Sequence, residues 1–80
     1  MLNEKEILKY AMLGIKVEIE QLEKDIKQGY KYIEQIERGE KVKTPKTKQE
    51  ILDIVADKKA KMEQLDKQRF EISWKLDMED

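Results

Sequence analysis

The sequence predicts an all-α fold, an antiparallel two-helix coiled-coil hairpin. Three observations predict it: two apolar seams with heptad spacing, one stretch between them that holds the turn-forming residues, and a charged fraction of 44% that nearly cancels to a net charge of −1. This charge balance favours helices coated with alternating charges over a disordered polyelectrolyte. A single domain of 80 residues is close to the size at which a core needs support from association. We therefore expect two hairpins to dimerise into a four-helix bundle.

The first helix is expected at about residues 3–38. Its apolar residues alternate four and three apart, which is the spacing of a coiled-coil seam. These seam positions are Leu8, Met12, Ile15, Ile19, Leu22, Ile26, Gly29, Ile33 and Ile36. Because Gly29 has no side chain, it either admits close backbone approach or weakens the helix by about 1 kcal/mol relative to alanine. Tyr30 is expected to fill the space beside it.

The connector is expected at about residues 39–44. Gly39 follows the helical pattern where a left-handed cap is expected. The second helix has two possible starts: Thr44 and Pro45 can supply its N-cap and first-turn proline, or Thr47 and Glu50 can form a capping box three residues later. Because the connector is short, the two helices must lie side by side and antiparallel.

The second helix, expected at about residues 45–76, repeats the seam spacing less regularly. Lys58 and Arg69 occupy two of its seam positions. Long basic side chains can cover apolar neighbours with their alkyl stems while their charges reach water or a facing carboxylate. The apolar seam positions are Ile51, Val55, Met62, Leu65, Ile72 and Leu76.

A second apolar stripe on each helix lies away from its seam, and antiparallel pairing places both stripes at the open end of the hairpin. The predicted protein interface consists of Leu2, Tyr10, Leu13, Val17, Phe70, Trp74 and Met78. Burying one large apolar side chain is worth roughly 1.5–3 kcal/mol, so leaving this set in water would forfeit much of a small domain's stability. We therefore expect a non-enzymatic protein–protein interaction module, such as an adaptor, inhibitor, assembly factor or small regulator. Its partner is expected to be a second copy, another protein, or both.

The connector and its flanks form a basic tip. From residue 38 to residue 48, five bases stand against one acid, Glu40, which gives a local charge of +4. The five bases are Arg38, Lys41, Lys43, Lys46 and Lys48. They predict an alternative function, in which the tip contacts nucleic-acid phosphates or an acidic protein surface. No aromatic residue lies among these bases, so base stacking has no support.

The sequence offers no support for an enzyme. It contains neither histidine nor cysteine, which removes imidazole and thiolate chemistry and the usual zinc and haem ligands. Ser73 is the only serine, and no base is available to activate it. We expect no catalytic residue, no metal, no cofactor and no small-molecule substrate. The longest uncharged run, residues 10–15, is too short for a signal peptide or a membrane span, so a cytoplasmic location is expected.

Overall fold

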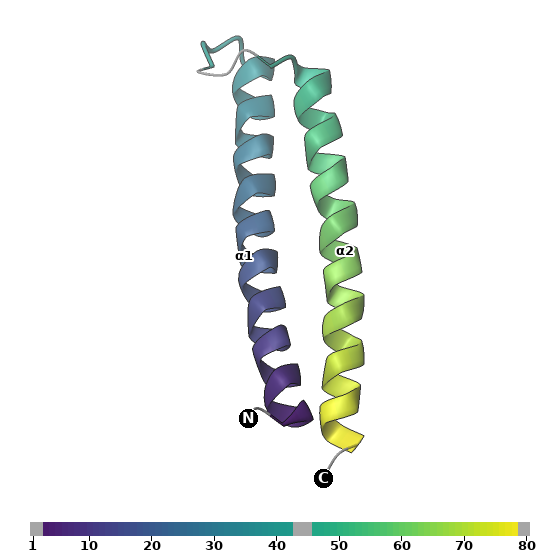
Figure 1. The fold of residues 1–80 in the computed structure, drawn as a ribbon. Helices are drawn as coiled ribbons and strands as arrows, with labels where there is room; N and C mark the ends of the chain where they lie inside the picture. Colours follow the sequence, from purple (N-terminus) through teal and green to yellow (C-terminus); the bar gives the residue numbers. More distant parts are fainter. Residues whose placement is uncertain (1–2, 43–45, 79–80) are drawn as a thin grey trace.

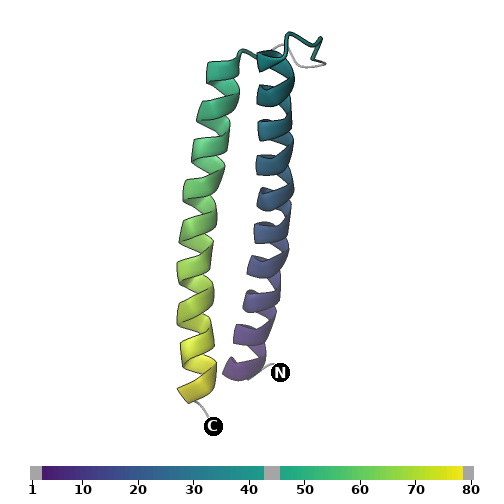
Figure 2. The ribbon, with the colours of Figure 1, turned by 180° about the vertical axis from the view of Figure 1, so that it is seen from behind.

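The computed structural model of the chain is a helical hairpin, and the structure describes residues 3–42 and 46–78. Helix α1 (Glu4–Glu37) and helix α2 (Lys48–Met78) lie side by side and antiparallel (Figure 1). Seen from behind, the two helices remain adjacent along their whole length, and both termini lie at the end opposite the connector (Figure 2). The described residues contain no strand. The predicted all-α hairpin is confirmed.

Residues that flank α1 cap both of its ends: Asn3 precedes the helix and Gly39 follows it. The side-chain oxygen of Asn3 accepts a hydrogen bond from the backbone N–H of Glu6 at 2.8 Å, which satisfies one of the free amides of the first turn. At the other end, Gly39 has a φ of 75° and donates its N–H to the carbonyl of Ile36. Glu40 donates to the carbonyl of Gln35, which completes a Schellman motif. The predicted left-handed cap at Gly39 is confirmed.

Helix α2 begins at Lys48, which corresponds to the later of the two starts that the sequence offers. The hydroxyl of Thr47 accepts a hydrogen bond from the backbone N–H of Glu50 at 3.2 Å and donates to the Glu50 carboxylate at 3.2 Å. The Thr47 hydroxyl therefore caps the first turn of the helix, and the Glu50 carboxylate accepts a hydrogen bond from that hydroxyl. Thr44 and Pro45, which define the earlier start, lie outside the described residues. The helix continues to Met78, two residues beyond the expected end at Leu76.

The core follows the predicted seam. Every buried apolar side chain in the described ranges occupies a seam position, namely Ile19, Leu22, Ile26, Ile33, Ile51, Val55 and Leu65. They form two clusters that Met62 bridges. Towards the open end the seam is covered less completely, because Leu8, Met12, Ile15, Ile72 and Leu76 are only half-buried. The hairpin is thus well packed in its middle and near the connector, and incompletely packed where its termini lie.

Gly29 lies at a close approach between the helices. A Cβ atom built on it would lie 2.5 Å from Cγ2 of Val55 and 3.7 Å from Cγ2 of Ile51. The glycine therefore admits close approach, which is the first of its two predicted roles. The expectation that Tyr30 fills the adjacent space is wrong, because Tyr30 is exposed and does not line the hollow beside Gly29. The Tyr30 ring is 44% exposed and lies 4.8 Å from Nζ of Lys59.

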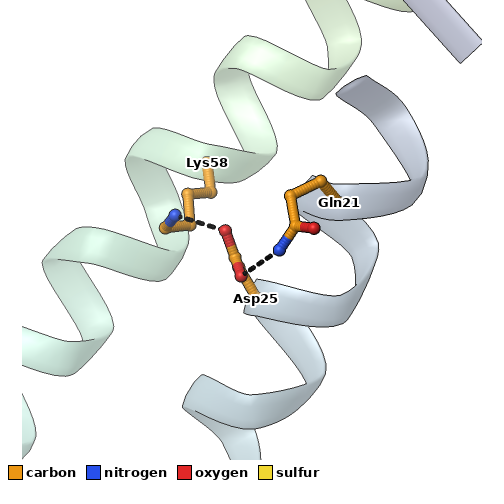
Figure 3. A network of polar contacts seen from close by, with 3 residues as sticks. All are labelled: Gln21, Asp25 and Lys58. Carbon is orange, nitrogen blue, oxygen red and sulfur yellow. Dashed lines mark hydrogen bonds and ion pairs between the residues drawn. The ribbon is translucent and has the colours of Figure 1, made fainter. Parts of the chain in front are cut away.

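One polar network links the middle of the two helices. The Lys58 ammonium on the α2 seam lies 2.8 Å from Oδ2 of Asp25 on α1, and the Gln21 side-chain amide donates to Oδ1 of Asp25 at 3.0 Å (Figure 3). The hydrogen bond from Lys58, followed by that from Gln21, lowers the pKa of Asp25. Lys58 thus reaches a facing carboxylate, as its position predicted. Arg69, the other seam base, pairs instead with Asp66 of its own helix at 2.9 Å.

Candidate functional site

The first half of α1 exposes a set of apolar residues on the side away from α2. The predicted interface residues Tyr10, Leu13 and Val17 are between 58% and 62% exposed. Ile7, which the sequence interpretation missed, is 53% exposed on the same side of the helix. Gly14 lies among them and is exposed as well. We call this set, Ile7, Tyr10, Leu13, Gly14 and Val17, the α1 outer surface. Leu2, also predicted to belong to it, lies outside the described residues.

The signal that could have revealed Ile7 is its spacing. Ile7, Tyr10, Gly14 and Val17 are three, four and three residues apart, so they form a second heptad pattern on α1. Ile7 lies directly before the seam residue Leu8, at the edge of the α1 outer surface. Ile7 lies about 60° from the centre of that surface, so it is not opposite the seam as Tyr10 and Val17 are.

The last turns of α2 expose a second set, which we call the α2 outer surface. It consists of Phe70, Trp74 and Met78, each four residues from the next, so they follow one another along one side of the helix. All three were predicted interface residues, and they are between 61% and 72% exposed. A shallow, open hollow of about 300 Å³ adjoins Phe70, and Met12, Asp66, Arg69 and Ser73 complete its lining.

The two outer surfaces face away from each other. At about 100° of rotation per residue, the centre of each surface lies roughly 160–170° from the seam of its own helix. Because the seams face each other, the α1 outer surface and the α2 outer surface point in opposite directions. From the sequence, the two stripes were expected to form one protein interface at the open end. The hairpin separates them into two back-to-back surfaces, and one flat partner surface cannot cover both.

The charges that border the two outer surfaces differ. On the first half of α1, Glu6, Glu18 and Glu20 lie within about 90° of the centre of the α1 outer surface, whereas Lys5, Lys9 and Lys16 lie more than about 100° from it. The α1 outer surface therefore has an acidic border. Around the α2 outer surface the charges are mixed: the base Lys67 and the acids Glu63, Glu71 and Asp77 lie within about 90° of its centre, and Lys75 lies about 100° from it.

At the basic tip, two of the five predicted bases pair with carboxylates at the end of α1. Arg38 pairs with Glu34, and Lys48 pairs with Glu37 at 2.8 Å. Lys41 is exposed, and Lys46 is exposed while also lining a hollow that lies beside Gly29. Lys43 lies outside the described residues. These two pairs bring acidic groups next to the tip, so its positive charge is weaker than the count between residues 38 and 48 implies.

No arrangement suited to catalysis is found among the described residues. The hollow beside Gly29 has a volume of about 250 Å³ and is lined by Asp25, Lys58 and apolar side chains, among others. Its carboxylate, that of Asp25, already pairs with the Lys58 ammonium group. In the two described ranges, no group of three potential metal-binding side chains comes together. Ser73 lines the hollow beside Phe70, next to Asp66 and Arg69, which pair with each other.

In comparisons with known proteins, no family model, no curated protein and no solved structure matches the chain. Neither α1 nor α2, over the residues described, is sufficiently long and apolar to cross a membrane.

Proposed function

We propose that the protein is a non-enzymatic protein–protein interaction module that works through the α1 outer surface and the α2 outer surface. One observation carries the proposal: large apolar side chains are exposed on both helices at the end where the seam is only half-buried. Covering one such side chain completely is worth roughly 1.5–3 kcal/mol. Covering several would add free energy comparable to the whole stability of a small domain, about 5–15 kcal/mol. A role as adaptor, inhibitor, assembly factor or small regulator fits such a surface.

For the α2 outer surface we propose a second copy of the chain as the partner. Two α2 helices can pair antiparallel about a two-fold axis at Trp74, so that the aromatic and Met side chains of both copies interleave. In that pairing Glu71 of one copy comes within about two residues, or roughly 3 Å of axial rise, of Lys75 of the other. The mixed border therefore supports self-association. The resulting dimer has four helices, with the two α2 helices in the middle.

The experiment that tests this proposal is sedimentation equilibrium across the micromolar range. The natural chain should form a dimer, and Trp74→Glu should be monomeric with its helix content retained. Leu13→Glu is the matched control, because Leu13 is exposed to a similar degree on the α1 outer surface. It should remain a dimer. A natural chain that stays monomeric would remove self-association, and a dimer lost only in Leu13→Glu would move the two-fold interface to α1.

The alternative function, contact with nucleic acid through the basic tip, has weaker support. Two of its bases, Arg38 and Lys48, are paired with glutamates of α1. Nucleic-acid binding through the tip would rest on phosphate contacts alone, so it would depend steeply on salt. Association that is insensitive to salt and lost in Trp74→Glu would favour the protein-interaction proposal.

A further inference from the structure

We infer that the α1 outer surface binds a helix of another protein, an amphipathic helix whose apolar side is bordered by lysine and arginine. This inference rests on the proposed function and names the partner of one of its two surfaces. It depends on the spacing of the apolar residues, the position of Gly14 and the sign of the bordering charges.

The spacing of the α1 outer surface fits a helix rather than a strand or a flat surface. Ile7, Tyr10, Gly14 and Val17 repeat the alternation of three and four that forms the intramolecular seam. From Ile7 to Val17 the surface extends for about 15 Å, or roughly three helical turns. A partner helix of that length can place its own side chains between these residues in the same way that α2 packs against the seam.

Gly14 supplies a second, independent indication of a closely packed helix. Glycine weakens an exposed helix relative to alanine, so its position inside α1 has a cost. At Gly29 the benefit is visible, because a Cβ atom there would lie 2.5 Å from Val55. At Gly14 no heavy atom lies within 4 Å of the corresponding Cβ position. Gly14 thus lies within the α1 outer surface, where the lack of a side chain leaves room for a helix to approach as closely as α2 does at Gly29.

The acidic border determines which helix fits. Glu6, Glu18 and Glu20 flank the apolar residues, and the nearest lysine on the same side of α1, Lys24, lies seven residues beyond Val17. A second α1 outer surface would bring the same three acids against them, which costs free energy through like-charge repulsion. The α2 outer surface is not predominantly basic, and an anionic membrane would be repelled too. A helix bordered by lysine or arginine is the occupant with complementary charge.

The test uses two synthetic peptides of about three heptads that share one leucine seam. One carries lysine at the positions beside the seam, and the other carries glutamate. Each is titrated into the natural, full-length chain by calorimetry at roughly 50 mM and roughly 500 mM salt. The lysine peptide should bind at least about tenfold more tightly at low salt, and this advantage should shrink at high salt. A lysine peptide of the same composition with a scrambled seam should not bind.

Substitutions in the chain test whether the lysine peptide binds at the α1 outer surface. Val17→Glu should abolish binding of the lysine peptide. Glu20→Lys should weaken binding of the lysine peptide several-fold. Glu23→Lys is a matched charge reversal three residues away and should not weaken it, because Glu23 lies more than about 100° from the centre of the α1 outer surface. Circular dichroism of each variant verifies that it remains helical. Equal affinity for the two seam peptides, no binding of the lysine peptide, or equal effects of the two charge reversals would overturn the inference.

Failure of this inference and failure of the proposed function give different results. A natural chain that is monomeric but binds the lysine peptide would remove the α2 dimer and support the inference. A dimer that is lost in Trp74→Glu but binds neither peptide would support self-association and overturn the inference. Loss of the dimer in Leu13→Glu would show that a second copy occupies the α1 outer surface, which also overturns the inference.

Discussion

The close approach of the helices at Gly29 predicts the outcome of adding a single methyl group. In Gly29→Ala the new Cβ would lie 2.5 Å from Cγ2 of Val55, whereas ordinary contacts lie at 3.4–4 Å. Val55 is 4% exposed, and its branched side chain is stiff, so it cannot turn away. The helices must move apart, which for an overpacked core costs about 1–3 kcal/mol. The higher helix propensity of alanine returns about 1 kcal/mol.

Gly14→Ala isolates the propensity effect, because nothing lies within 4 Å of its Cβ position. This variant should be more stable than the natural chain by about 1 kcal/mol. Gly29→Ala should be less stable than Gly14→Ala by about 1–3 kcal/mol, the cost of overpacking. Urea denaturation followed by circular dichroism measures both free energies of unfolding, at one fixed protein concentration because association shifts apparent stability.

A double-mutant cycle with Val55 tests the cause. Removing Cγ2 in Val55→Ala should cost less free energy in the Gly29→Ala background than in the natural chain, because it also relieves the clash. If Gly29→Ala stabilises the hairpin as much as Gly14→Ala does, or if the Val55 substitution costs the same in both backgrounds, the helices are not in close contact at Gly29.

Three further predictions concern the seam and the connector. The pKa of Asp25 is lowered in the folded state, so the stabilisation it gives is present above the ordinary aspartate pKa of about 3.9 and is lost as the pH falls through the lowered value. The difference in unfolding free energy between the natural chain and Asp25→Asn should therefore be larger at neutral pH than in strong acid; a difference independent of pH would contradict the Lys58 contact. Ile19→Asp should abolish the far-ultraviolet helical signal, since it places an unpaired charge among buried side chains, and a stable, helical variant would show that the seam is misassigned. Inserting a few Gly and Ser residues after Lys41 should change the urea midpoint little, because loop-closure entropy grows slowly with length, and a large loss would mean that the connector packs against the helices.

The candidate site was only partly predictable from the sequence. Rotation of about 100° per residue was enough to identify Tyr10, Trp74 and their apolar neighbours as residues away from the seams. It did not identify Ile7, because this residue lies about 100° from the seam, at the edge of the α1 outer surface and not opposite the seam. Nor did it show that the two outer surfaces point in opposite directions, since that depends on both helices being aligned through their seams.

The sequence by itself determined the features that depend on near neighbours along the chain. Heptad spacing determined which residues form the seam, and Gly39 determined the end of α1, because periodicity and capping hydrogen bonds involve residues a few positions apart. Only the tertiary structure decided the role of Gly29, the outward position of Tyr30 and the different partners of Lys58 and Arg69. The physical reason is that these depend on the distance and rotation between the two helices, which all the seam side chains determine together.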